Sequence, residues 1–98
     1  MYEWDAQKAV KNAAKHDVTF EEAVTVFLDA EGIDGDDWRH SLHEARRWRV
    51  GRSDHGHILS VTYTLRGPYA EDIRLITARQ ASRRERAAYA APSPRRRD

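Results

Sequence analysis

The sequence contains no cysteine, which excludes a disulfide framework and a cysteine-based zinc site. It also lacks long hydrophobic runs: its apolar stretches extend over only a few residues, far below the ~20 needed to span a membrane. Residues 1–5 have neither the basic region nor the apolar region of a signal peptide. We therefore expect a cytoplasmic protein with a single domain over residues 1–91, followed by a disordered basic tail over residues 92–98.

Arginine is absent before residue 39, and lysine is absent after residue 15. Residues 1–37 hold three lysines against ten acidic residues, a balance of −7, whereas residues 38–98 hold fourteen arginines against six acidic residues, a balance of +8. Such a charge split suits a polyanionic partner for the C-terminal part. Because guanidinium groups match phosphate and stack on bases, RNA or DNA is the first candidate. A solvated arginine-rich face on an ordinary small domain is the alternative that charge leaves open.

Hydrophobic periodicity predicts two helices near the N-terminus. Asp5 is a candidate N-cap for a helix over residues 6–15, which has an alanine-rich contact face. Thr19 and Glu22 match a T-x-x-E capping box that opens a second helix. Its apolar residues recur at i, i+3, i+4, i+7 and i+8, which predicts a core-facing side with Phe27 fully buried: Phe20, Ala23, Val24, Phe27 and Leu28.

Residues 30–39 form a polar segment with an aspartate cluster, Asp34-Gly35-Asp36-Asp37. The cluster lacks the alternating ligand spacing and the terminal glutamate of an EF-hand calcium loop. We expect a solvated loop, with a poor edge strand around Ile33 as the alternative.

From residue 46 onward, apolar residues alternate with polar ones, which is typical of β-strands. The strand candidates are residues 46–50, 59–65 and 73–77, and the short turns between them predict an antiparallel meander. Ser82 and Glu85 form a second capping box, which predicts a last helix to about Tyr89. The predicted fold class is α+β: two N-terminal helices packed on an antiparallel sheet of three to four strands, with a C-terminal helix.

The meander should bring several arginines together. The first strand ends near Arg52 and the third near Arg79, and these ends lie at the same edge of the sheet. Arg83 follows at the start of the last helix, whose N-terminal amides attract anions. These three arginines predict a phosphate clamp. Arg66 lies at the opposite end of the middle strand, so it either serves a separate contact or the register differs from this arrangement.

RNA cleavage without a metal ion requires removal of the 2′-hydroxyl proton, stabilisation of the phosphorane charge and protonation of the leaving oxygen. Arginines can supply the second requirement. Histidines are the natural candidates for the proton transfers. A zinc site built from His40 and His43, or from His55 and His57, lacks an evident third ligand. We therefore expect no metal ion and no other cofactor. The histidines are His16, His40, His43, His55 and His57.

Several stretches together resemble the BrnT toxin family. The resemblance runs in order from residue 2 to about residue 90, and its most specific part is the run A-R-x-A-S-R-R-E-R at residues 78–86. The sequence departs from the family pattern at Asp17, where glycine is usual, and at residues 31–38, which lack the usual apolar strand. The matching stretches are residues 2–5, 15–23, 39–41, 51–53, 61–67 and 73–86, with Tyr89.

The resemblance implies a RelE-like ribonuclease toxin of a bacterial type II toxin–antitoxin module, which blocks translation by cutting RNA. It also implies a BrnA-like antitoxin with a ribbon-helix-helix part, so that operator DNA is bound only through the antitoxin. A module that binds nucleic acid or antitoxin without ribonuclease activity is the alternative. The implied catalytic residues are Arg52, Arg66, Arg79, Arg83 and His40, and the implied RNA-binding residues are Lys15, His16, Tyr63 and Arg86.

Overall fold

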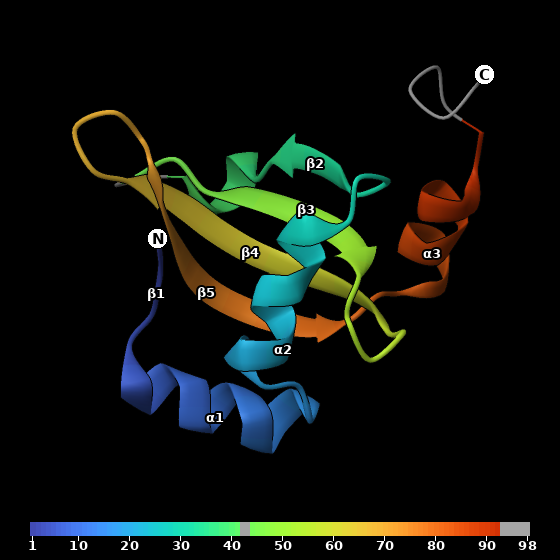
Figure 1. Ribbon diagram of the computed structural model, residues 1–98, viewed down its shortest axis with the longest axis horizontal. Helices are drawn as coiled ribbons and strands as arrows, with labels where there is room; N and C mark the ends of the chain where they lie inside the picture. Colours follow the sequence, from blue (N-terminus) through green and yellow to red (C-terminus); the bar gives the residue numbers. More distant parts are fainter. Residues whose placement is uncertain (42–43, 93–98) are drawn as a thin grey trace.

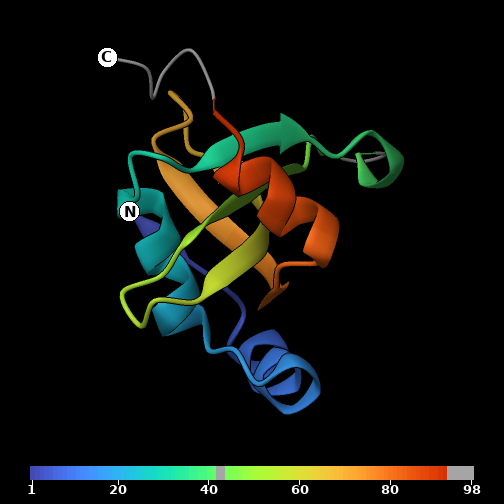
Figure 2. The same ribbon diagram turned by 90° about the vertical axis from the view of Figure 1, so that its right-hand side faces the viewer.

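The computed structural model describes residues 1–41 and 44–92, which form a five-stranded sheet with helices on both sides (Figures 1 and 2). The strand order is β1-β5-β4-β3-β2, and β1 is parallel to β5 whereas the other neighbouring pairs are antiparallel. The strands are β1 (Tyr2–Glu3), β2 (Ile33–Asp36), β3 (Arg47–Arg52), β4 (Ile58–Arg66) and β5 (Asp72–Gln80). The helices are α1 (Ala6–His16), α2 (Phe20–Val24) and α3 (Arg83–Ala90), with the 3₁₀ helices η1 (Thr25–Leu28) and η2 (Trp38–His40).

The predicted α+β class is confirmed, but the predicted sheet of three to four antiparallel strands is wrong, because the sheet has five strands and is mixed. The additional parallel strand is β1, which spans only two residues. It is held at the edge of β5, where the N–H of Ile73 donates to the carbonyl of Met1 at 2.8 Å. A two-residue strand has no periodic pattern of its own, so it can be recognised only from its pairing with β5.

The polar segment expected to be a loop forms the edge strand β2. Its carboxylates face arginines across the β2–β3 pair: Asp34 pairs with Arg49, and Asp36 pairs with Arg47 at 2.8 Å. Opposite charges directly across an antiparallel ladder stabilise strand pairing. These ion pairs replace the apolar contacts that the segment lacks, so the edge-strand alternative is the one realised.

Helix α1 forms where it is predicted and closes one edge of the sheet. Asp5 caps its first turn by accepting two backbone N–H bonds, and Asp17 ends it in the left-handed conformation, with a φ of 55°. Asn12, which is buried, donates to the carbonyls of Val18 and Ala78 at 3.0 and 2.9 Å and accepts from the N–H of Ala78 at 3.0 Å. The amide of Asn12 thus satisfies the backbone N–H and carbonyl of Ala78, in the part of β5 that β1 does not reach.

Helix α2 departs from its predicted pattern. Thr19 Oγ1 accepts the N–H of Glu22 at 3.1 Å, but the Glu22 carboxylate points to the turn after β3, so only half of the predicted capping box forms. After Val24 the helix tightens into η1, which has about 3.0 residues per turn instead of 3.6. This change turns Val26 into the core and Leu28 outward, where Leu28 is 79% exposed. Phe27 is only partly buried, so the prediction of its full burial is wrong.

The main hydrophobic core lies between one face of the sheet and the first two helices (Figure 1). Val18 and Phe20 come from the α1–α2 region, and the ring of Trp4 packs edge-on against Phe20 with centroids 5.8 Å apart. The α1–α2 region therefore lies over this face of the five-stranded sheet. The fully enclosed side chains are Val18, Phe20, Ala23, Val26, Leu59, Val61, Leu75 and Ala78.

Helix α3 packs on the opposite face of the sheet (Figure 2). Both hydrogen bonds of the predicted Ser82–Glu85 capping box are present. Tyr89 packs with Val50 and Ala81, and its hydroxyl donates to Asp29 Oδ2 at 2.6 Å. Of the predicted tail, residues 93–98 lie outside the described residues, as does His43. No helix in the described ranges has the length and apolar character needed to cross a membrane.

Candidate nucleic-acid interface

The sheet face opposite the main core carries a cavity of about 430 Å³. Strand register determines which side chains form the bottom of this cavity, because residues paired across antiparallel strands point to the same side of the sheet. Trp48 pairs with Thr62, while Ser60 pairs with Val50 and with Arg79. Helix α3 and the η2 segment stand on this side of the sheet (Figure 2). Around an apolar floor, the cavity has five ionisable side chains: Asp37, His40, Arg46, Arg79 and Glu85.

Arg79 is held in one orientation by α3. Its Nη1 and Nη2 donate to the two carboxylate oxygens of Glu85 at 2.7 and 3.0 Å. This bidentate bond raises the pKa of Arg79 and lowers the pKa of Glu85 to about 2. Glu85 is fixed in turn, since it accepts the backbone N–H of Ser82 at 2.8 Å. The capping box of α3 thus also positions a guanidinium group at the cavity.

His40 lines the same cavity as Arg79. Its Nδ1 lies 3.1 Å from both carboxylate oxygens of Asp37, so the carboxylate orients the ring and leaves Nε2 to exchange a proton. The side chain is 64% exposed, which makes it accessible to a large substrate. The structure therefore brings together two of the predicted catalytic residues, although they are 39 positions apart in the sequence.

Arg46 connects this cavity to a second hollow. Its side chain lines both spaces, and its Nε is buried without a hydrogen-bond partner among the described residues. Buried polar atoms in folded proteins are nearly always hydrogen-bonded, so this nitrogen needs an acceptor that a water molecule or a ligand can supply. Sequence reasoning did not single out Arg46.

The second hollow, of about 300 Å³, lies between α1 and β5. Lys8, Lys11 and Lys15 recur at i, i+3 and i+7 and so share one side of α1. They line the hollow with His16, and none of the three makes an ion pair within the described residues. The hollow shares Arg46 with the larger cavity, so the two form one continuous surface. We call this surface the basic track: Lys8, Lys11, Lys15, His16, Arg46 and Arg79.

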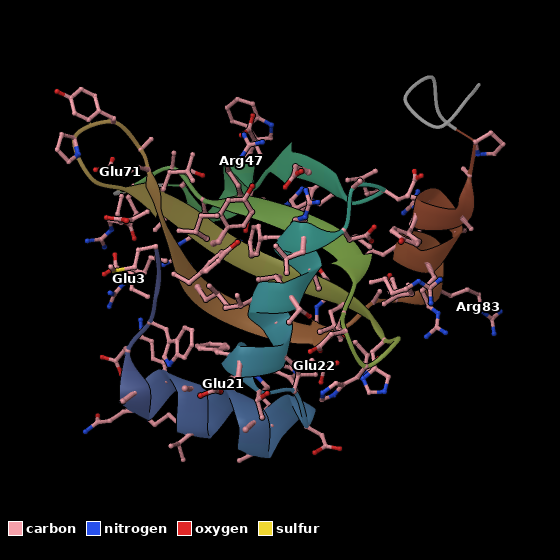
Figure 3. All side chains as sticks on the ribbon, in the orientation of Figure 1. Glu3, Glu21, Glu22, Arg47, Glu71 and Arg83 are labelled. Carbon is pink, nitrogen blue, oxygen red and sulfur yellow. The ribbon has the colours of Figure 1, made fainter. Side chains whose placement is uncertain are left out.

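The predicted clamp of Arg52, Arg79 and Arg83 is only partly assembled. Arg52 pairs with Ile58 and Arg79 pairs with Ser60, so both lie near the same end of the sheet, as predicted. The side chain of Arg52, however, lines a separate shallow hollow beside η1, with Nη1 3.5 Å from the carbonyl of Gly56. Arg83 extends outward from the start of α3 (Figure 3).

Three other predicted site residues lie away from the basic track. Arg66 ends β4, which places it about 26 Å along the strand from Ile58, at ~3.3 Å per residue, and its guanidinium pairs with Glu44 at 3.2 Å. Arg86 is exposed on α3. Tyr63 is buried on the main-core face of the sheet, where burial raises the pKa of its hydroxyl, which donates to Asp34 at 2.9 Å. Tyr63 therefore stabilises the packing of the sheet and does not line the cavity.

The signals for the residues that were not predicted, Lys8, Lys11 and Arg46, were present but ambiguous. The i, i+3, i+7 spacing of Lys8 and Lys11 with the predicted Lys15 was readable from the sequence, yet such spacing is equally typical of a solvated helix face. Arg46 has no distinguishing sequence context beside Arg47 and Arg49. These neighbours form ion pairs with β2, whereas Arg46 precedes β3 and faces the cavity side.

The Glu85–Arg79 pair should make stability depend on acid pH. Because the folded-state pKa of Glu85, about 2, lies below its ordinary value of 4.5, the stabilisation is present above the ordinary value and is lost as the pH falls toward 2. We expect Glu85→Gln, which can keep the cap, to lower the urea-derived free energy of unfolding at neutral pH. Its difference from the wild type should shrink as the measurement pH is lowered to about 3.

The matched control for this pH series is Glu21→Gln. Glu21 is exposed on α2 and makes no ion pair among the described residues, so its substitution should cost little at neutral pH. A difference between Glu85→Gln and the wild type that stays constant across the pH series would show that the ion pair contributes no stability.

Known proteins share both the sequence pattern and the architecture of this chain. The family model described as the ribonuclease toxin BrnT of type II toxin–antitoxin systems matches residues 4–85. The crystal structure of the Brucella abortus ribonuclease toxin BrnT is similar with a TM-score of 0.64 and 22% identity, covering 85% of this chain and 99% of that one, which establishes a common fold. No curated protein sequence matches significantly. Because the family model matches most of its length, the chain belongs to the BrnT family of ribonuclease toxins of type II toxin–antitoxin systems.

Proposed function

We propose that this chain is a RelE-like, metal-independent endoribonuclease that inhibits translation in the bacterial cytoplasm by cutting RNA on the face of the sheet opposite the main core. The observation that carries the proposal is the basic track itself, in which Arg46 lines both hollows and so joins the lysines of α1 to Arg79 and His40. A phosphate bound between the two hollows would meet the Arg46 guanidinium group, and the lysines of α1 would contact neighbouring phosphates of the same strand.

The arrangement suits attack of a ribose 2′-oxygen on the adjacent phosphorus. In that reaction the 2′-hydroxyl loses its proton, a bond forms from the 2′-oxygen to phosphorus, and the 5′-oxygen departs with a proton. Arg79 is positioned to stabilise the added charge on the phosphorane, and its fixed orientation means that little reorganisation accompanies the reaction. His40 is the proposed proton-transfer residue, oriented by Asp37.

For the other predicted catalytic arginines, Arg52, Arg66 and Arg83, a catalytic role is supported by the family resemblance alone. Arg52 and Arg83 lie at the same end of the molecule as Arg79, and Arg86 follows on α3, so they could guide the strand as it leaves the cavity. Arg66 is engaged with Glu44 at the far end of β4.

The proposed partner that neutralises the toxin is a BrnA-like antitoxin, which also binds operator DNA on behalf of the complex. An antitoxin that inhibits by covering the basic track should present acidic side chains to it, because the lysines there make no ion pair within the described residues. Association should therefore weaken as salt concentration rises.

Expression of this chain alone in bacteria tests whether it is an enzyme. We expect growth arrest with fragmented cellular RNA, and rescue by co-expression of the antitoxin. A strain that accumulates folded protein but grows normally with intact RNA would support the alternative, a module that binds nucleic acid or antitoxin without cutting.

Replacing Lys11 and Lys15 together with alanine should weaken RNA binding in a salt-dependent way. Each phosphate contact contributes about 0.7 to the slope of log affinity against log salt for a single strand, so the double variant should lower the slope by about 1.4. The measurement uses fluorescence anisotropy with a 2′-deoxy oligonucleotide, which cannot undergo the cleavage. Arg84→Ala, an exposed change on α3, is the control and should alter the slope less.

A further inference from the structure

A second cluster of chemically reactive side chains lies away from the basic track, between α2 and the turn that joins β3 to β4. It contains Glu22, His55 and His57. The Nδ1 atoms of His57 and His55 lie 2.8 and 3.4 Å from the two carboxylate oxygens of Glu22. One potential ligand atom from each residue falls within 4.8 Å of the others. Figure 3 shows Glu22 on α2, and Figure 1 shows α2 beside this turn.

The turn is built to present both histidines to Glu22. The N–H of Ser53 donates to the carbonyl of His57 at 2.8 Å, and the N–H of Gly56 donates to the carbonyl of Ser53 at 2.9 Å. Gly56 has a φ of 81°, a left-handed value that favours glycine. The turn is also bonded to the first residue of η1, directly after α2, since the N–H of Asp54 donates to Thr25 Oγ1 at 2.9 Å.

Ser53 contacts all three residues of the cluster. Its hydroxyl donates to Glu22 Oε2 at 2.6 Å, and its oxygen accepts the backbone N–H groups of His55 and His57 at 3.2 and 3.3 Å. Outer contacts of this kind fix the orientation of metal-binding side chains in known sites. Asp54 lies 3.6 Å from Nε2 of His55, where it can orient that ring from its far side.

The burial of Glu22 argues for a ligand rather than a surface ion pair. Its side chain is 8% exposed, whereas those of His55 and His57 are 61% and 50% exposed, so the carboxylate forms the floor of a site whose imidazoles are open to solvent. A hydrogen bond accounts for the contact of Glu22 with His57 at 2.8 Å. It does not account for the convergence of His55, whose Nδ1 is 3.4 Å away.

We propose that Glu22, His55 and His57 bind one divalent transition-metal cation of the zinc class, with water completing the coordination. Two imidazoles and one carboxylate suit zinc, nickel, copper or iron, whereas magnesium and calcium prefer oxygen ligands throughout. The bound cation joins the β3–β4 turn to α2, so its role is structural. The proposal does not depend on the ribonuclease assignment, because the cluster shares no residue with the basic track.

Titration of the untagged full-length protein with zinc tests this site. We expect saturable binding of one zinc ion per chain by calorimetry, and a rise in the melting temperature that a chelator reverses. Cobalt substituted for zinc should give visible d–d absorption bands. Absence of one-to-one binding at millimolar zinc would overturn the proposal.

Variants separate this site from incidental zinc binding by surface histidines. His55→Ala and His57→Ala remove exposed ligands and should fold, and each should weaken zinc binding at least tenfold and abolish the rise in melting temperature. Ser53→Ala should weaken binding about 10- to 100-fold through loss of the outer contact. His16→Ala removes a histidine outside the cluster and should bind zinc like the wild type. Equal zinc binding by His57→Ala and His16→Ala would show that the cluster is a hydrogen-bonded group only.

Discussion

Replacing Arg79 with alanine should reduce the rate of RNA cleavage about a hundredfold, which corresponds to about 3 kcal/mol of transition-state stabilisation. The reason is geometric: Arg79 is the arginine at the cavity that Glu85 holds by two hydrogen bonds, so its guanidinium is already oriented when charge develops on the phosphorane. RNA binding should change much less, because the lysines of the basic track supply contacts that do not depend on the reaction. Single-turnover cleavage and anisotropy measurements separate the two effects.

The control for Arg79→Ala is Arg84→Ala. Arg84 carries the same charge, is exposed on α3 and makes no ion pair among the described residues. Its substitution should leave the single-turnover rate nearly unchanged. Equal losses from the two variants would mean that the arginines act as a diffuse electrostatic field and that Arg79 has no specific role in the chemistry.

Glu85 provides a further distinction, since it acts on the reaction only through Arg79. Glu85→Gln keeps a group that can cap α3 but loses the charge that holds the guanidinium. If orientation matters, its cleavage rate should fall while RNA affinity rises slightly, because a negative charge has been removed beside the cavity.

Local signals in the sequence were sufficient for most of the fold. Asp5 caps the start of α1, and Asp17 ends the helix in the left-handed conformation. Both effects depend only on neighbouring residues. The Ser82–Glu85 capping box is likewise local, as is the alternation along β4. Each of these features acts within a few residues and is therefore readable without knowledge of the partner.

Features that depend on distant partners could not be predicted in this way. Strand β2 exists because Asp34 and Asp36 meet Arg49 and Arg47, and nothing within residues 30–39 reveals those partners. The Glu22 carboxylate fits a capping box in the sequence, yet in the structure it contacts Ser53 and His57 of the β3–β4 turn instead. In both cases a tertiary contact outweighs the local preference.

The charge split of the sequence favours a polyanionic partner, but it does not show which charged side chains are free to meet that partner. Arg47, Arg49, Arg66, Arg74 and Arg79 are engaged in ion pairs, so much of the C-terminal positive charge is neutralised within the protein. The unpaired lysines of α1 come instead from the half of the chain with a net charge of −7. Which charges remain available to a ligand is decided by tertiary pairing, and composition does not contain that information.

Replacing Phe20 with alanine should lower the free energy of unfolding by about 3–5 kcal/mol, a large part of the roughly 5–15 kcal/mol available to a domain of this size. Phe20 is 1% exposed and packs against Trp4, so truncation leaves a cavity in the main core. Leu28→Ala should stay within about 0.5 kcal/mol, because η1 turns Leu28 outward, where it is 79% exposed. Urea unfolding of the two variants measures both effects. A Leu28→Ala cost as large as that of Phe20→Ala would mean that α2 continues as a regular helix with Leu28 in the core, and the path of the chain toward β2 would then have to differ.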